Sequence, residues 1–179
     1  MKIDFKSCTE EELWKYVASN LKKKGIDTVL VGGAVVSIYS EGAYQSGDLD
    51  FVKMNMFEKG IPKAMNELGF EKKSQRHYAH PGCTHLFIEF PSSFLEIGED
   101  NQITPDEVEI EGVKIKILNP TDCVKDRLAS YIHFNARECL DQAVLVAKKH
   151  PVNLNKIKKW CKGEKGESHW NDFLVKLKE

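Results

Sequence analysis

The sequence predicts an α/β (α+β) chain, in which a small mixed β-sheet with helices precedes a helical C-terminal section. Two patterns predict this order: short apolar strand-like runs alternate with helical periodicity up to about residue 118, and only helical periodicity follows. A hydrophobic content of 41% in 179 residues is enough for a packed core and excludes a disordered or fibrous chain. We therefore expect a body at residues 1–118 and a helical section at residues 119–179.

The first helix has the clearest local signal. Thr9 and Glu12 form a capping box, and an apolar stripe from Leu13 to Leu21 precedes Gly25, where the helix is expected to end. The remaining elements of the body are expected as strands at 28–31, 48–52, 69–73, 77–80, 84–90, 94–97, 107–110 and 113–117, a short helix at 34–38, and a helix at Met56–Leu68. Helices are then expected at 120–134, 137–149, 153–161 and 168–178, the first with Pro120 at its tolerated opening position.

The amino-acid composition also indicates in which cellular compartment the protein is expected. The five cysteines are scattered, odd in number and never spaced Cys-x-x-Cys, a usage typical of reduced thiols in the cytoplasm. No apolar run approaches the roughly 18 residues needed to span a bilayer, and the opening residues do not read as a signal peptide. We expect a cytoplasmic protein with no membrane partner.

The charge is unevenly distributed along the chain. Residues 1–112 have a formal net charge of −7 and residues 113–179 one of +6. This asymmetry indicates either ordinary solvated helix faces or a basic section that attracts a polyanion.

The richest chemistry lies between residues 31 and 52. Asp48 and Asp50 share one face of a strand at roughly 7 Å spacing, while the residues between and after them point into the core. Two parallel carboxylates repel each other, so such a pair commonly binds a divalent cation; Mg²⁺ prefers carboxylates together with water and substrate phosphates. The Gly32-Gly33 turn, between a strand and a helix, lets backbone amides approach a phosphate closely.

The order Val31-Gly32-Gly33, short helix, then Ser46-Gly-Asp48-Leu-Asp50-Phe resembles the signature of the nucleotidyltransferase superfamily that includes DNA polymerase β. The resemblance covers residues ~28–118 as a catalytic domain. The trailing helices look like those of small prokaryotic members, some of which belong to toxin–antitoxin or abortive-infection systems and act with a partner protein. A dinucleotide-binding interpretation is poorer, because Gly-x-Gly-x-x-Gly is absent.

The resemblance implies transfer of a nucleoside monophosphate from an NTP to a hydroxyl, with Mg²⁺ or Mn²⁺ as cofactor. Asp48 and Asp50 would hold the metal, and Gly32, Gly33 and Ser46 would contact the nucleotide. The superfamily uses a third carboxylate, for which the chain offers Glu89 or Glu96. Glu89 is favoured because it is the only charge within the apolar run 86–90, which is typical of a strand buried on both faces. An isolated carboxylate is costly there unless it is compensated.

Two further groups have alternatives. Lys125 and Arg127 are candidate triphosphate contacts, or they pair with Asp122 and Asp126 on their own helix. A group of His77, His80, Cys83 and His85 suggests zinc, but its spacing matches no standard finger, and a hairpin loop around Pro81-Gly82 is the favoured interpretation.

The sequence leaves the acceptor open: tRNA, a protein side chain or a small molecule such as an aminoglycoside. The competing functional class is a catalytically inactive module of the same fold that binds nucleotide, RNA or a protein partner.

Overall fold

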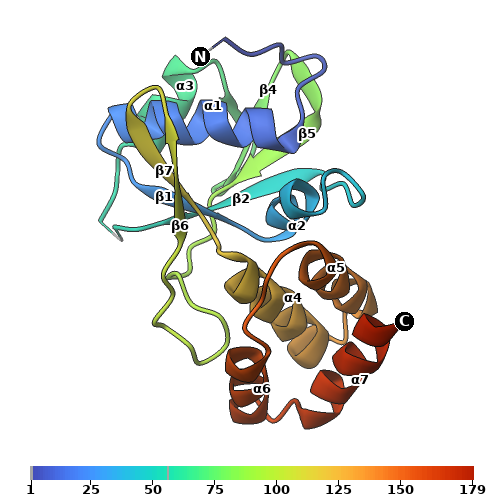
Figure 1. Cartoon of the computed structure of the whole chain (residues 1–179). Helices are drawn as coiled ribbons and strands as arrows, with labels where there is room; N and C mark the ends of the chain where they lie inside the picture. The colour runs from blue at the N-terminus through green and yellow to red at the C-terminus, as the bar shows by residue number, and fades with distance from the viewer. Residues whose placement is uncertain (1, 56) are drawn as a thin grey trace.

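The computed structural model describes residues 2–55 and 57–179, which form a mixed seven-stranded sheet with helices packed against it and a cluster of helices at one end (Figure 1). The strand order is β3-β4-β5-β2-β1-β7-β6. The strands are β1 (Thr28–Val31), β2 (Asp48–Lys53), β3 (Glu71–Lys72), β4 (His77–His80), β5 (Cys83–Glu89), β6 (Asp106–Ile110) and β7 (Val113–Ile117). The helices are α1 (Glu10–Lys23), α2 (Gly33–Tyr39), α3 (Ile61–Glu67), α4 (Pro120–Phe134), α5 (Arg137–Lys149), α6 (Leu154–Gly163) and α7 (Glu167–Lys178).

Helix α1 forms as its capping box predicts. The Thr9 hydroxyl accepts from the Glu12 amide, and the Glu12 carboxylate accepts from the Thr9 amide, so two backbone donors at the start of the helix are satisfied. Leu13, Val17 and Leu21 are fully buried on the face that packs against the sheet and α2. Their burial anchors the helix, because amphipathic packing supplies most helical stability in a folded protein.

The pairing of the central strands decides which residues meet. Strand β2 runs antiparallel to β1 and parallel to β5, and β1 also runs parallel to β7, as expected for a mixed sheet. In the register of β2 with β5, Asp48 lies opposite Phe87 and Asp50 lies opposite Glu89. Residues far apart in the chain are therefore brought to one end of β2.

The helices α4 to α7 pack together beside α2 (Figure 1). Helix α4 begins after Asn119, whose side chain accepts from the Asp122 amide, and ends at Asn135 in the left-handed conformation. Trp160 and Trp170 are buried in this cluster. Among the described residues, no helix has the length and apolar character that a membrane crossing requires.

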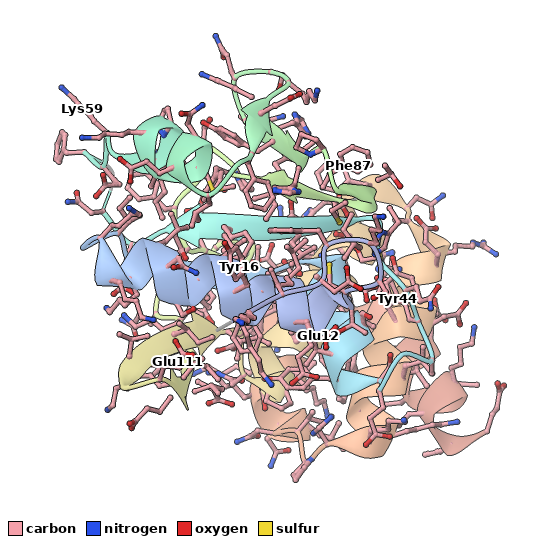
Figure 2. The ribbon with its side chains drawn as sticks, turned by 90° about the horizontal axis from the view of Figure 1, so that it is seen from above. Glu12, Tyr16, Tyr44, Lys59, Phe87 and Glu111 are labelled. Atoms are coloured by element: carbon pink, nitrogen blue, oxygen red, sulfur yellow. The ribbon has the colours of Figure 1, made fainter. Side chains whose placement is uncertain are left out.

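Three sequence predictions are wrong in detail. Residues 94–97 form no strand and contribute only an isolated bridge between Ile97 and Asp100, because this segment lies in the long connection from β5 to β6. The helix predicted at Met56–Leu68 spans only Ile61–Glu67; Met56 itself lies outside the described residues. Strand β5 is not buried on both faces, since Phe87 is 45% exposed and points away from the core (Figure 2).

Lys125 is not available to a nucleotide. Its side chain is completely buried, and its ammonium lies 2.5 Å from an oxygen of Asp100 and 2.7 Å from an oxygen of Asp122. The structure thus realises the alternative of pairing with Asp122 on the same helix. Because Asp100 lies in the connection from β5 to β6, this buried ion pair attaches that connection to α4.

We predict that Lys125→Met lowers the free energy of unfolding by about 3–5 kcal/mol, because it leaves the carboxylate of Asp122 buried beside an apolar side chain. Urea denaturation would measure the loss, with Lys158→Met on the exposed face of α6 as the matched control. Adding Asp122→Asn to Lys125→Met should recover part of the loss. An unchanged urea midpoint for Lys125→Met would contradict the structural role.

Candidate active site

Three carboxylates converge where β2 and β5 run side by side. Asp48 and Asp50 come from β2 and Glu89 from β5, and each offers an oxygen within 4.8 Å of the others. The alternation of β2 produces this arrangement, since Leu49 and Phe51 are fully buried in the core and the two aspartates point the other way. Oxygen ligands at these separations suit a hard divalent cation such as Mg²⁺ or Mn²⁺.

Ser46 orients Asp48. Its hydroxyl oxygen lies 2.9 Å from the Asp48 carbonyl oxygen and 3.1 Å from Asp48 Oδ1, so its single proton is shared between the two acceptors. The Ser46 amide in turn donates to the carboxylate of Glu10 at the start of α1. Ser46 therefore connects the first aspartate to the first turn of α1, a link that no local motif indicated.

The Gly32-Gly33 turn lies directly against the carboxylates. A Cβ atom at Gly32 would be 2.4 Å from Asp50 Oδ2, and the residue has a φ of +77°, which favours glycine. A Cβ at Gly33 would be 2.8 Å from the Ser46 hydroxyl oxygen. The absence of side chains at both positions leaves the backbone in contact with the groups that surround the proposed metal site.

Asp50 carries the strongest electrostatic perturbation of the group. Burial in the first place, then the neighbouring charges of Asp48 and Glu89, raise the pKa of its carboxyl from 3.8 to about 7, while the Arg127 guanidinium opposes the shift. A bound cation would offset the negative charge that the three carboxylates bring together. The donor set therefore fits a divalent ion, with Asp48, Asp50 and Glu89 as its ligands.

Glu89 also has a guanidinium and an imidazole as neighbours. Its carboxylate oxygens lie 3.3 Å from Nε of Arg76 and 3.1 Å from Nε2 of His77, which is its register partner on β4. The turn at Pro81-Gly82 did not predict this pair, because the register shifts between Tyr78 and His80, and only that irregularity places His77 opposite Glu89. Glu96 lies near Asp50 in the same cleft, but among the described residues the carboxylate group contains Glu89 and not Glu96.

A cleft adjoins Asp50 and Gly32. Its other walls come from α4, including Arg127, and from the connection after β5, including Phe94 and Glu96. The Arg127 guanidinium pairs with Asp126 at 2.5 Å and donates to the Gln142 side chain at 3.3 Å. The structure thus brings Arg127 to the cleft. Lys125, two residues earlier on the same helix, is buried elsewhere and does not reach it.

The comparisons with known proteins agree with this geometry. Residues 10–72 match the model of a family described as nucleotidyl transferase of unknown function (DUF2204), a span that contains the Gly-Gly turn and both aspartates. Over this span the chain is similar to nucleotidyl transferases. A search of curated proteins found no match to it.

Solved structures show the same fold. An antigenic nucleotidyltransferase-like protein from Paracoccidioides brasiliensis is similar with a TM-score of 0.60 and 19% identity, over 79% of this chain and 77% of that one. The antibiotic-resistance factor ANT(2'')-Ia is similar in its solution structure, with a TM-score of 0.53 and 11% identity over 89% of this chain and 88% of that one. Its crystal structure in complex with adenylyl-2''-tobramycin gives a TM-score of 0.52 at 11% identity, over 89% and 94%.

The raised pKa of Asp50 predicts a pH-dependent stability in the metal-free protein. The native state holds this proton more tightly than the unfolded chain between about pH 4 and about pH 7, so stability falls as pH rises through that window and levels off above it. Asp50→Asn should remove this component and stabilise the metal-free protein by about 1–4 kcal/mol at pH 8. Thermal denaturation from pH 4 to pH 8 would measure both effects, with Glu109→Gln on the exposed edge strand β6 as control. Identical pH profiles for Asp50→Asn and the unmodified protein would contradict the prediction.

We also predict that Gly32→Ala is more damaging than Gly42→Ala. Both glycines have positive φ, and a Cβ at Gly42 meets nothing within 4 Å, so both variants incur a backbone cost of about 1–2 kcal/mol but only Gly32→Ala collides with Asp50. Mg²⁺ binding, followed by calorimetry, should weaken in Gly32→Ala and stay unchanged in Gly42→Ala. Equal Mg²⁺ affinities would show that the turn does not position Asp50.

Proposed function

We propose that this protein is an Mg²⁺-dependent nucleotidyltransferase that transfers a nucleoside monophosphate from an NTP to a hydroxyl of an acceptor. The observation that carries the proposal is the convergence of Asp48, Asp50 and Glu89 beside the Gly32-Gly33 turn, with Arg127 lining the adjoining cleft. The fold and the family match at residues 10–72 support it.

Each of these residues has a task in that reaction. Asp48 and Asp50 would hold Mg²⁺ or Mn²⁺, which when bound neutralises triphosphate charge and activates the acceptor hydroxyl. Ser46 keeps the Asp48 carboxylate in its orientation, and Gly32 leaves room for the Asp50 carboxylate. Arg127 contributes positive charge at the phosphates. Catalysis would consist mainly of positioning and charge stabilisation.

Glu89 completes the carboxylate group and helps to deprotonate the acceptor. The acceptor oxygen attacks the α-phosphorus of the NTP. The bond from the α-phosphorus to the oxygen that bridges it to the β-phosphorus breaks, and pyrophosphate leaves. The hydroxyl proton passes to the Glu89 carboxylate. The ion pairs of Glu89 with His77 and Arg76 must loosen or share the carboxylate for this role.

The same ion pairs favour the second candidate function, a catalytically inactive module that binds nucleotide, RNA or a protein partner. In that module Arg76 pairs with Glu89 permanently and His77 contacts it, so only Asp48 and Asp50 remain for a cation. A partner protein of a toxin–antitoxin pair stays a prediction from sequence under either function.

The acceptor can be identified by label transfer. The protein would be incubated with each NTP, labelled at the α-phosphate, and with total RNA, total protein or an aminoglycoside such as tobramycin, whose adenylylated form is bound by the similarly folded ANT(2'')-Ia. Label in one fraction, dependent on Mg²⁺ and absent with Asp48→Asn/Asp50→Asn, would support the proposal. Mg²⁺-dependent NTP binding without transfer to any fraction would support the binding module.

Glu89→Gln separates the two candidate functions most sharply. We predict that it spares most of the NTP affinity, which the aspartates supply, and lowers transfer by at least about 100-fold through loss of the acceptor-side carboxylate. Transfer rates and the melting temperature would be measured together, with Glu96→Gln as the control in the same cleft. A destabilised but fully active Glu89→Gln protein would remove Glu89 from the site and leave Glu96 as the candidate.

A further inference from the structure

A second group of metal-ligating side chains lies apart from the carboxylates. Cys8 comes from the segment before α1, and Cys83 and His85 come from the start of β5. The two sulfur atoms are 3.9 Å apart, and Cys83 Sγ is 3.8 Å from His85 Nδ1. All three residues offer a ligand atom within 4.8 Å of the others. His85 lies two residues before Phe87, the register partner of Asp48, but its group and the carboxylates form two separate sets of ligands.

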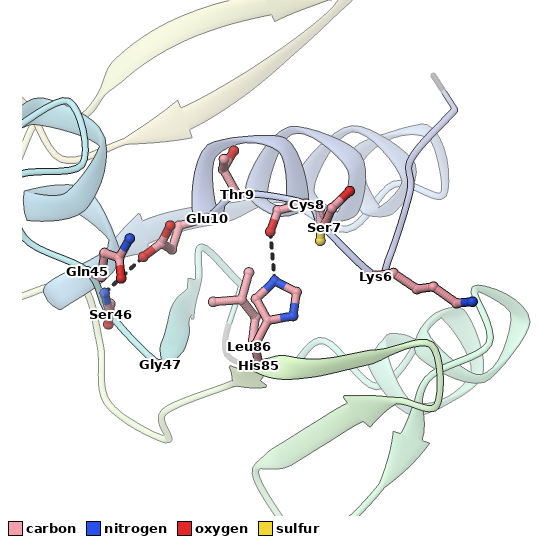
Figure 3. A pocket seen from close by; sticks show the side chains of 10 residues that line it. All are labelled: Lys6, Ser7, Cys8, Thr9, Glu10, Gln45, Ser46, Gly47, His85 and Leu86. Atoms are coloured by element: carbon pink, nitrogen blue, oxygen red, sulfur yellow. Dashed lines mark hydrogen bonds between the residues drawn. The ribbon is translucent and has the colours of Figure 1, made fainter.

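The orientation of His85 is set by a hydrogen bond. Its Nε2 lies 2.8 Å from the carbonyl oxygen of Cys8, as the dashed line in Figure 3 shows. A carbonyl oxygen can only accept, so Nε2 carries the proton and donates it. In the neutral ring, Nδ1 then presents its lone pair toward the Cys83 sulfur. Metal-binding histidines are oriented in the same way, with the second ring nitrogen donating to a carbonyl or a carboxylate.

The separations match those of a tetrahedral zinc site. With Zn–S near 2.3 Å and Zn–N near 2.0–2.1 Å, two sulfur ligands lie about 3.8 Å apart and a sulfur and a nitrogen ligand about 3.6 Å apart. The observed 3.9 Å and 3.8 Å differ from these values by a few tenths of an ångström or less. Small side-chain adjustments would therefore be enough to coordinate an ion.

Access to the group is open on one side. A pocket of about 540 Å³ is lined by Cys8 and His85 together with polar residues such as Lys6, Ser7 and Glu10 (Figure 3). An ion held by three protein ligands keeps its fourth position for water or another small ligand, and here that position would face the pocket.

We propose that Cys8, Cys83 and His85 bind one Zn²⁺ ion, with both cysteines as thiolates and the fourth position open to this pocket. Each thiol releases its proton to solvent when the ion binds. The ion would join the segment before α1 to β5, two parts of the chain that are 75 residues apart. The inference does not rest on the proposed nucleotidyl transfer.

Cobalt is a suitable probe, because Co²⁺ occupies zinc sites and thiolate ligation gives it a charge-transfer absorption that carboxylates do not give. The whole chain, reduced and freed of metal, would be titrated with Co²⁺ and then with Zn²⁺. We expect one Co²⁺ per chain with tetrahedral and thiolate absorption, full displacement by Zn²⁺, and a rise in melting temperature with Zn²⁺.

Two variants test the ligands. His85→Gln keeps an N–H that can donate to the Cys8 carbonyl but removes the Nδ1 ligand, and Cys83→Ser removes a thiolate; each should weaken Zn²⁺ binding by at least about 10–100-fold. Cys139→Ser, at another buried cysteine, should leave it unchanged. Asp48→Asn/Asp50→Asn should also keep the thiolate absorption, which separates this site from the carboxylate site and the fate of this proposal from that of nucleotidyl transfer.

Three results would overturn the proposal. The first is the absence of thiolate absorption in the reduced protein, and the second is equal Zn²⁺ affinity in His85→Gln and the unmodified chain. The third is a Cys8–Cys83 disulfide whose reduction yields a protein that takes up no metal. Because His85 is exposed, His85→Gln decides the question even if Cys83→Ser fails to fold.

Discussion

Repulsion among three carboxylates at the junction of β2 and β5 is the constraint around which the rest of the structure is arranged. Parallel pairing places Asp50 opposite Glu89, and strand alternation places Asp48 on the same side. Such a group is costly without compensation: burial first and then the repulsion raise the pKa of the Asp50 carboxyl to about 7. Several neighbouring side chains and one glycine relieve this repulsion or make room for it.

Compensation comes from several elements. The Ser46 hydroxyl donates to Asp48, and Gly32 leaves space for the Asp50 carboxylate. Arg76 and His77, at the start of β4, contact the Glu89 carboxylate. Arg127 approaches from α4 and lowers the pKa of Asp50. None of these contacts closes the cleft beside Asp50, so a cation and a polyphosphate would complete the charge balance.

The helical section contributes to the site through two neighbouring side chains with separate roles. Arg127 lines the cleft, whereas Lys125 is buried between Asp100 and Asp122 and attaches the connection from β5 to β6 to α4. That connection supplies Phe94 and Glu96 to the opposite wall of the cleft. A buried ion pair outside the cleft therefore attaches one of its walls to α4.

The sequence by itself determined the features that depend on neighbours in the chain. The capping box of α1, the turn at Gly32-Gly33 and the outward pair Asp48 and Asp50 were predictable from patterns a few residues long, and the boundaries of β1, β4, α4 and α5 follow the predicted ranges. These features arise from backbone hydrogen bonds, glycine conformation and strand alternation, which act locally.

Only the tertiary structure decided which distant residues meet. It selected Glu89 over Glu96 as the neighbour of the aspartates, because β5 and not residues 94–97 pairs with β2. It turned Lys125 inward and Arg127 toward the cleft, and it brought Cys8 to Cys83 across 75 residues. The physical reason is that strand partners and helix docking depend on long-range packing, whose register no local pattern contains.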